Sequence, residues 1–284
     1  DLTILNDTVT DSGIVQMEWQ QEPDNILWCV REDGQLAALT YQRSENVVSW
    51  HRHILGGAFG TGNAVVESIA SISGDLNEDE LWVIVKRTVN GATVRYIECF
   101  SDFDFDETAP TDFKFLDSHL SYSGSATTTL SGLSHLEGQV VSILADGSVH
   151  ANKTVSSGAI TLDRSVTSAC VGLPYDSILQ TMRIEGGANE GTSQGKIKRI
   201  SKVVLRLFET VGVKVGPSLT KLEAIPFRTT SSNLSAPVDT LIEGDKEIEF
   251  DDDYNSDGHI FIKQDQPLPA SILAIYPTLV TNDG

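Results

Sequence analysis

Two histidines stand two positions apart in the segment Val47 to Ile54, which the sequence predicts to be a strand. Side chains two apart on a strand point to the same face, so the imidazoles of His51 and His53 would lie together. Imidazole nitrogens are common ligands of divalent metal ions, and both rings could reach one ion. No third ligand is identifiable. A polar strand face is the alternative, and we predict no metal ligand and no cofactor.

Residues 253–258 (DYNSDG) have the alternating oxygen-bearing side chains that begin a calcium-binding loop. Such a loop needs a glutamate at its end that binds the ion with two oxygens, and Gln264 stands in that place. The flanking segments are typical of strands, not helices. The pattern therefore favours an Asp-Gly hairpin turn, while the series Asp251, Asp252 and Asp253 leaves weak cation binding open.

Residues 56–62 (GGAFGTG) form a glycine-rich run of the kind that can approach a phosphate closely. The run holds no basic residue and no helix signal follows it, so we expect a flexible loop. The sequence has no serine-hydrolase elbow, zinc-protease motif or nucleotide-binding loop. Carboxylates are plentiful, but nothing singles out the pair that a glycosidase needs. We therefore predict no catalytic residue and no enzyme activity.

One basic cluster occurs in the chain, and its members are Lys196, Lys198, Arg199, Lys202 and Arg206. In an acidic protein such a patch could meet an acidic surface on a neighbouring subunit. The alternative is a strand edge that its lysines protect from unwanted pairing.

The chain has 284 residues, a formal net charge of −20 and 40% hydrophobic residues. This is enough apolar sequence for about two folded domains. The negative charge opposes binding to nucleic acid, which depends on basic side chains that neutralise phosphates. No apolar run is long enough for a membrane-spanning helix, and the first ten residues do not resemble a signal peptide. A start at Asp1 instead of Met is what a fragment or a processed product would show.

The three cysteines are too few and too far apart for a disulfide framework or a cysteine zinc site. Reduced folding in a cytoplasm fits this usage best. Cys29 and Cys99 lie in apolar strand patterns, so we expect their thiols to be buried. Cys170 is the third.

Nearly every segment of the chain is typical of a strand. Asp33-Gly34 and Asn90-Gly91 are strong hairpin signals between apolar runs, and Asp146-Gly147 and Ser157-Gly158 supply further turns. We predict an all-β fold, a propeller-like antiparallel meander with an inserted small β-barrel. Composition changes near residues 112 and 186 divide the chain into a meander (1–112), the barrel (113–186) and a C-terminal part that returns to the first (187–284).

The C-terminal part is ambiguous at one place. Residues 196–215 allow a helix in their first half, but the β-branched residues and Gly212 favour a strand. Residues 247–250 and 259–263 are predicted to form a last hairpin around the segment 251–258. Residues 270–276 are predicted to form the closing strand.

The first part carries motifs at residues 27–34 (LWCVREDG), 39–41 (LTY), 48–53 (VSWHRH), 80–88 (ELWVIVKRT) and 93–98 (TVRYIE). Residues 115–118 (FLDS), 133–138 (LSHLEG) and 144–147 (LADG) follow, then 172–175 (GLPY) and 264–269 (QDQPLP). Together these resemble a family of phage tail proteins that includes the tail tubular or nozzle proteins of short-tailed phages. The segment 113–186 is similar to a small barrel these proteins share, which is like a domain of ubiquitin-activating enzymes.

The resemblance covers most of the chain and implies a structural protein of the phage virion, a homo-oligomer assembled in the host cytoplasm into a ring of the tail. The ring would conduct double-stranded DNA during ejection without binding it specifically. Residues 102–107 and 251–257 are candidates for an acidic lumen that repels phosphates. The small barrel would contact tail adaptor and fibre proteins. The motifs are strand and turn residues, so no catalytic residue is implied, and Trp28, Trp50 and Trp82 are expected to anchor cores.

Two alternatives stay open. A carbohydrate-binding or carbohydrate-degrading module of a tail spike would show exposed aromatic residues in a groove beside a carboxylate pair. A distal hub or baseplate protein of a long-tailed phage would have the same fold at another place in the tail.

Overall fold

The fold is known from a computed structural model, which describes residues 2–4, 6–74, 78–101, 109–185, 187–188, 191–192, 195–226 and 241–282. These residues form strands almost throughout, so the predicted all-β class is confirmed. Helical structure among them is limited to three short 3-10 turns: η1 (Asp7–Val9), η2 (Pro110–Asp112) and η3 (Ser134–Leu136). Within the described ranges, no helix has the length and apolar composition needed to cross a bilayer.

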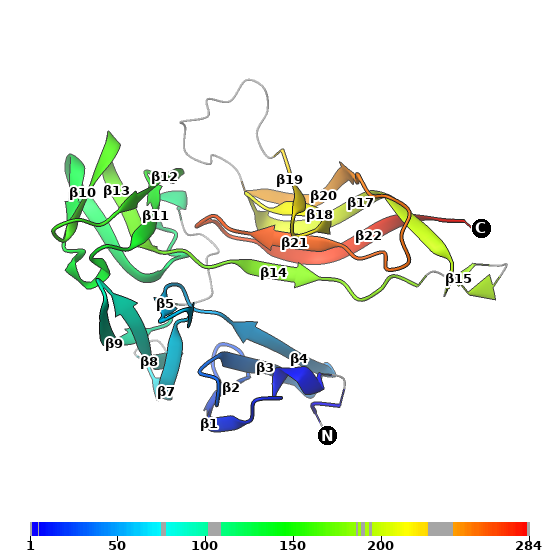
Figure 1. The fold of residues 1–284 in the computed structure, drawn as a ribbon, viewed down its shortest axis with the longest axis horizontal. Coiled ribbons are helices and arrows are strands. Elements are labelled where there is room, and N and C mark those ends of the chain that lie inside the picture. The colour runs from blue at the N-terminus through cyan, green and yellow to red at the C-terminus, as the bar shows by residue number, and fades with distance from the viewer. Residues whose placement is uncertain are drawn as a thin grey trace. The chain divides into compact units, whose positions relative to one another are not determined.

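The chain divides into two compact units, whose strands are labelled in Figure 1. Unit 1 consists of residues 1–105, 116–143 and 151–175, and unit 2 of residues 106–115, 144–150 and 176–284. The boundaries expected near residues 112 and 186 stay predictions.

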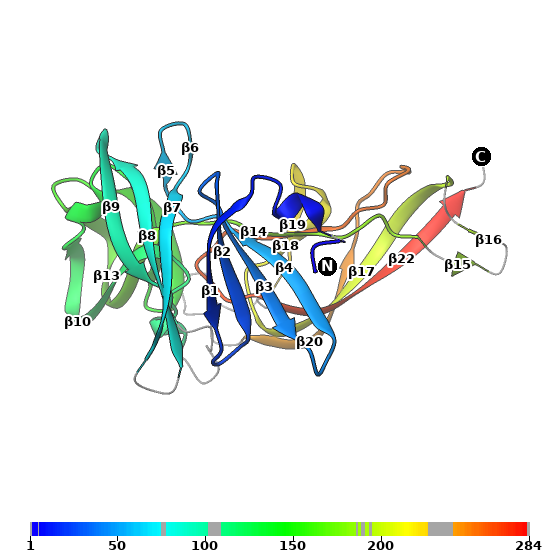
Figure 2. The same ribbon diagram turned by 90° about the horizontal axis from the view of Figure 1, so that it is seen from below.

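Unit 1 begins with a four-stranded antiparallel meander, whose strands lie side by side in Figure 2. Its strands are β1 (Ile14–Gln20), β2 (Ile26–Arg31), β3 (Leu36–Gln42) and β4 (Val47–His53). The predicted hairpin at Asp33-Gly34 is confirmed between β2 and β3, and Gly34 has the positive φ of 78° that this turn requires. Strand β1 was missed, although Val15, Met17 and Trp19 alternate with polar residues in the period-two pattern of a strand.

A second antiparallel meander follows, made of β7 (Val65–Ser73), β8 (Asp79–Val89) and β9 (Ala92–Cys99). Asn90 and Gly91 both have positive φ, as a tight two-residue turn requires, so the second predicted hairpin is also confirmed. The small pair β5 (Ala58–Phe59) and β6 (Gly62–Asn63) precedes it.

The two meanders share one apolar core, because alternate side chains of each strand point toward it. Its buried members are Trp28, Val30, Leu36, Ala38, Leu55, Ala64, Val66, Ile69, Leu81, Val83 and Val85. Two glutamines of β1 add polar links. The Gln16 amide donates to the carbonyl of Ile69 at 2.6 Å, and the Gln20 amide donates to the carbonyl of Asp79 at 3.0 Å. The paired sheets are therefore held by a core and by hydrogen bonds along β1.

A further sheet has the strand order β10-β13-β11-β12. The strands are β10 (Asp117–Ser131), β11 (Val140–Ala145), β12 (Ser148–Thr154) and β13 (Ala159–Leu173). Strand β13 is long and runs without a break through the second half of this region. The turns at Asp146-Gly147 and Ser157-Gly158 have the positive φ angles expected of them. No closed barrel is found among the described residues, and the propeller-like arrangement stays a prediction.

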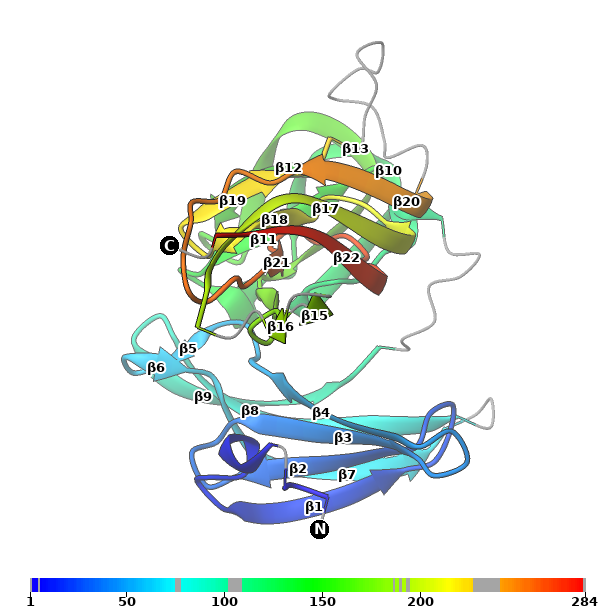
Figure 3. The same ribbon diagram turned by 90° about the vertical axis from the view of Figure 1, so that its right-hand side faces the viewer.

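Unit 2 contains two sheets, one ordered β20-β17-β22, as Figure 3 shows, and one ordered β14-β21-β18-β19. The first comprises β17 (Ile197–Thr210), β20 (Ile242–Glu249) and β22 (Ser271–Asn282). The second comprises β14 (Ser177–Gln180), β18 (Lys214–Ser218), β19 (Lys221–Ala224) and β21 (Phe261–Gln264). A short hairpin pairs β15 (Gly187–Ala188) with β16 (Gly191–Thr192). An apolar cluster that includes Val203, Leu205, Val213 and Ile262 forms the core.

Two expectations for unit 2 have opposite outcomes. The segment after residue 196 is a strand, as predicted. The last hairpin was predicted wrongly, because β20 pairs with β17 whereas β21 pairs with β14 and β18. The segment 251–258 carries the chain from one sheet to the other, and it is anchored midway by paired backbone bonds between Asn255 and Lys198.

The turn at Gly34 provides a test of the fold of unit 1. A Cβ at Gly34 would lie 2.5 Å from Val65 Cγ1, whereas one at Gly91 would meet nothing within 4 Å. Gly91→Ala should therefore cost only the positive-φ penalty, about 1–2 kcal/mol of unfolding free energy. Gly34→Ala should cost about 1–3 kcal/mol more, because overpacking is added. Urea denaturation of both variants checks this, and equal losses would contradict the packing of β7 against the turn.

Candidate functional site

The His51 and His53 rings lie on the same face of β4, as the sequence predicted. His51 Nδ1 and His53 Nε2 are 2.7 Å apart and share a hydrogen bond, and His51 Nε2 lies 3.1 Å from Thr40 Oγ1. Trp28 packs on His53 with ring centroids 4.9 Å apart, and Phe100 packs on Trp28 at 5.4 Å. The pair therefore closes one side of the core between the two sheets of unit 1.

Burial determines the charge of this pair. It lowers the pKa of His53 to about 4, with a smaller contribution from the positive charge His51 would carry, and it lowers the pKa of His51 in the same direction. Both rings are neutral at pH 7, and each uses one ring nitrogen in the hydrogen bond to the other. The described part of the chain holds no group of three or more metal-binding side chains. The geometry is that of a hydrogen-bonded aromatic pair in a core.

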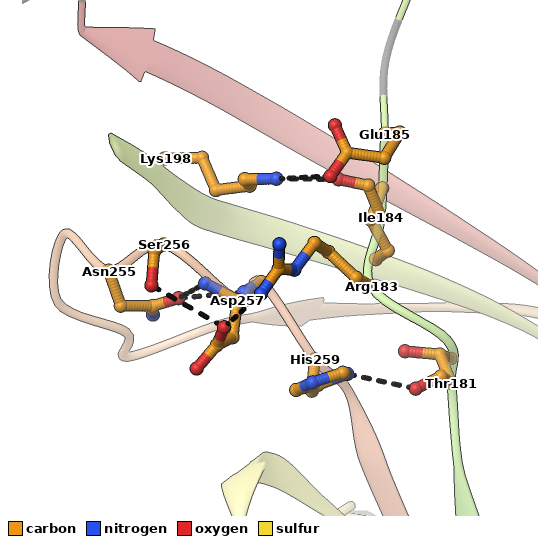
Figure 4. A network of polar contacts seen from close by, with 10 residues as sticks. Thr181, Arg183, Ile184, Glu185, Lys198, Asn255, Ser256, Asp257 and His259 are labelled. Atoms are coloured by element: carbon orange, nitrogen blue, oxygen red, sulfur yellow. Dashed lines mark hydrogen bonds and ion pairs between the residues drawn. The ribbon is translucent and has the colours of Figure 1, made fainter. Parts of the chain in front are cut away.

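The segment 251–258, the candidate calcium loop, uses its oxygens internally (Figure 4). Asn255 Oδ1 accepts from the backbone N–H groups of Asp257 and Gly258, at 2.9 and 2.7 Å. Asn255 Nδ2 donates to the carboxylate of Asp252, which is 5% exposed. The Asn255 side chain thus holds the loop as an Asx turn, a local turn closed by an Asn side chain. The segment is a turn, but it does not close the Asp-Gly hairpin that the sequence favoured.

Two further acidic side chains of this loop form ion pairs. Asp251 forms an ion pair with Lys221, and Asp257 forms one with Arg183. The pKa of Asp251 is lowered by its hydrogen bond with Lys221. This stretch therefore offers less unpaired negative charge to a DNA lumen than its sequence suggests. The other candidate stretch, residues 102–107, lies outside the described residues.

Lys198 is completely buried, although the sequence placed it in an exposed basic cluster. Its ammonium donates to the carbonyl of Ile184 at 3.1 Å and to Glu185 Oε1 at 3.2 Å, as Figure 4 shows. The aliphatic part of Lys198 lies against Gly258, where a Cβ would come within 2.8 Å of it. Lys198 therefore ties the segment before β15 to the 251–258 loop.

Two other members of the basic cluster, Lys202 and Arg206, are partly exposed on β17. Lys202 pairs with Glu247 and Arg206 pairs with Asp245, both on the adjacent strand β20. Arg206 also lies over the Tyr276 ring of β22. Strand β17 is central in its sheet, so the alternative of a lysine-protected strand edge was wrong. These cations are balanced by carboxylates of their own sheet.

Gly56, the first residue of the glycine-rich run, uses both its backbone N–H and its carbonyl in hydrogen bonds. The Gly56 N–H donates to Asp117 Oδ2 at 2.6 Å, and its carbonyl accepts from Arg87 Nε at 2.8 Å. A Cβ at Gly56 would lie 2.7 Å from the carbonyl of Pro174. Gly56 therefore serves close packing between segments, not approach to a phosphate.

Arg87 forms a buried network that the sequence analysis missed. Its side chain is 1% exposed and makes two hydrogen bonds to the carboxylate of Glu98 besides the bond to Gly56. Arg87 occupies an inward position of β8, between Val85 and Val89. An arginine in an otherwise apolar alternating series was the signal available, because a buried guanidinium needs a partner.

Asp117 and Tyr175 extend this network. Burial raises the pKa of Asp117 to about 6, while the hydrogen bond from Gly56 and the charge of Arg87 act in the opposite direction. Burial and the Asp117 charge raise the pKa of Tyr175. Such shifts are found at catalytic sites and in structural networks alike. Here the groups are engaged in joining the 55–57 segment, β8, β9 and β10, so we interpret the network as a structural junction.

Unit 1 also exposes apolar side chains on the outer face of its first sheet, where a polar face is usual. Val15, Met17 and Trp19 form a row on β1, exposed by 62, 57 and 44%. We call these three residues the β1 face. Beside it, Val9 covers Cys29 and Ala37, and Trp50 donates to the carbonyl of Leu2, so the N-terminal segment shields part of this sheet.

The second sheet has an apolar outer face as well. Strand pairing aligns Ala70, Trp82 and Cys99 in one row and Ile84 and Ile97 in the next. Ile97 is 71% exposed, and Cys99 is exposed, so the expected burial of its thiol was wrong. We call Trp82, Ile84 and Ile97 the β9 face. Of the three tryptophans expected in cores, Trp28 lies in one and Trp50 packs against the small cluster of Val9, Cys29 and Ala37, whereas Trp82 lies half-buried on an outer face.

No protein-family model matches the sequence, and neither does any curated protein sequence. The resemblance to phage tail proteins therefore stays a prediction that rests on the motifs of the chain.

Removing the partner of Arg87 should be costly. Glu98→Gln keeps the size of the side chain but leaves a guanidinium charge buried without a carboxylate, which should cost about 3–5 kcal/mol of unfolding free energy. The double variant Arg87→Met with Glu98→Gln should be more stable than Glu98→Gln alone. Denaturation measures both, with Asp245→Asn as a control, since that exposed ion pair should contribute little. A loss in the control as large as in Glu98→Gln would contradict the account.

The His53 pKa predicts a pH dependence. Because the folded-state pKa is about 4 and the ordinary value is 6.5, the unfolded chain binds the proton first. Stability should fall as the pH drops from 6.5 to 4, by up to about 3 kcal/mol from this group. In His53→Gln this part of the fall should disappear, since other titrating groups are common to both proteins. Denaturation at a series of pH values measures the difference, and parallel profiles would refute it.

Proposed function

We propose that this protein is a structural component of a phage tail, which assembles into a ring of the nozzle or tubular type and conducts double-stranded DNA. The distal hub of a long-tailed phage would use the same architecture at another position. The adaptor and fibre proteins of the tail are its expected partners, with the β10–β13 sheet as their contact.

The observation that carries this proposal is the pair of exposed apolar faces on unit 1. The β1 face and the β9 face expose apolar side chains in a chain of net charge −20, and the described part of unit 2 exposes others, such as Met182 and Leu273. Contiguous exposed apolar side chains mark protein contacts. A ring with head-to-tail contacts requires two different surfaces on each copy, and unit 1 carries two.

The motifs that resemble phage tail proteins support the same conclusion. Residues 27–34 form β2 and the turn after it, and residues 80–88 and 93–98 lie on β8 and β9. The residues of these motifs lie in the core of unit 1, in the turn at Gly34 and on the β9 face. Residues in such positions determine shape and assembly, and they carry no reaction.

The charge of the chain supports passage of DNA without binding. A sequence pI near 4.5 gives a surface that repels phosphates at neutral pH. On β20, four carboxylates are exposed, those of Glu243, Asp245, Glu247 and Glu249. Basic residues of β17 neutralise two of them. The excess negative charge of the chain would keep a moving duplex from adhering.

The assembly state tests the proposal. Light scattering and native mass spectrometry of the purified protein at tens of micromolar should show one closed oligomer of defined mass. The same oligomer should leave the mobility of double-stranded DNA unchanged at physiological salt. A monomer at every concentration, or tight DNA binding, would contradict the proposed function.

A further inference from the structure

Two histidines attach strand β4 to the interior of unit 1. The buried apolar core between the two meanders contains residues of β2, β3, β7 and β8 but none of β4. On its core-facing side β4 contributes His51 and His53, whose ring centroids lie 6.4 and 4.9 Å from that of Trp28. Strand β4 is also the edge of its sheet and pairs only with β3. Its contact with the core therefore depends on the histidine pair.

The hydrogen bond inside this pair limits how many protons the pair can carry. His51 Nδ1 and His53 Nε2 lie 2.7 Å apart, so one nitrogen has to donate and the other has to accept. A neutral imidazole has one N–H and one acceptor nitrogen, whereas a protonated ring has two N–H groups and no acceptor. Two protonated rings would direct N–H groups and positive charges at each other across this distance. The closed arrangement therefore excludes the doubly protonated pair.

We propose that β4 is a proton-operated strand, which leaves the core face of unit 1 when both histidines are protonated, while the rest of the unit stays folded. The inference goes beyond the proposed function, because it assigns unit 1 a conformational switch that ring assembly does not require.

Charged side chains that face the pair are already bound to other groups. Strands β2 and β3 present no charged side chain on this side. On β1, Glu18 accepts a hydrogen bond from Gln16, and on β9, Glu98 accepts two from Arg87. Burial is the largest cause that lowers the pKa of His53, and no carboxylate offsets it. Protons on the pair therefore gain no counter-charge until β4 opens to water.

Gly56, shortly after the end of β4, provides an anchor at which the opening should stop. Its N–H donates to Asp117 Oδ2 at 2.6 Å, and its carbonyl accepts from Arg87 Nε at 2.8 Å. Burial raises the pKa of Asp117 to about 6, so the folded protein binds this proton before the unfolded chain does. The anchor therefore gains stability as the pH falls through 6, in the range in which the histidine pair loses it.

Hydrogen exchange of the backbone amides of the full chain tests the switch between pH 6.5 and pH 4.5. The opened strand has ordinary histidines that bind protons first, because the pKa of His53 is lowered from 6.5 to about 4 and that of His51 is lowered too. Opening takes up two protons, so protection of residues 47–53 should fall by up to about 100-fold per pH unit, after division by the intrinsic exchange rate. Strand β13 should keep its protection.

Single variants measure the number of protons. His53→Gln and His51→Gln each keep a side chain that can form a hydrogen bond and remove one titrating ring, so in each the fall should be no more than about tenfold per pH unit. Either variant suffices if the other does not fold at pH 7. The control is His259→Gln in unit 2, which should keep the steep dependence of the native protein.

Three outcomes would overturn the proposal. Protection of residues 47–53 that does not depend on pH would show that the pair holds no switch. An equally steep fall in the native protein and in both single variants would assign the protons to other groups. Simultaneous loss of protection in β13 would show that acid unfolds unit 1 as a whole and not strand β4.

Discussion

The buried guanidinium of Arg87 is the constraint on which the arrangement of unit 1 depends. A charge taken out of water has to be matched by a carboxylate and by hydrogen bonds, and Glu98 and the carbonyl of Gly56 supply them. Gly56 is held in turn by Asp117 at the start of β10. One arginine thus fixes the register of β8 against β9 and attaches the segment after β4 and the β10–β13 pair to them. Asp117 and Tyr175, whose pKa values are raised by burial, belong to this junction.

The inner faces of both sheets and the residues of the junction are buried inside unit 1. The outer faces of the sheets are therefore the surfaces that can bind a partner. A two-sheet unit normally presents polar side chains to water on its outer faces. Here β1 and β9 present methionine, tryptophan and isoleucine instead. The histidine pair and the Asn255 loop, which the sequence marked as possible sites, have their nitrogen and oxygen atoms engaged inside the fold. The exposed apolar side chains are therefore suited to contact with another protein surface.

Local signals in the sequence predicted local structure well. Asp33-Gly34 and Asn90-Gly91 predicted hairpins because few residues tolerate positive φ, and β-branched residues predicted a strand at β17. The pairing of β20 and β21 with other strands could not be predicted, because strand partners are set by long-range packing. The burial of Lys198 and the exposure of Cys99 were missed for the same reason. The alternation of apolar and polar residues along a strand shows that the strand has two different faces. It does not show which of these faces another strand or segment covers.

The central claim is that this chain acts by joining sheets of successive copies and not through a reactive pocket. Electron cryomicroscopy of the native protein at assembly concentration tests it most directly, since it reveals both symmetry and contacts. The account predicts a closed ring whose contacts between copies bury the β1 face and the β9 face. Single particles that are monomers, or a ring that leaves both of these faces open to solvent, would contradict it.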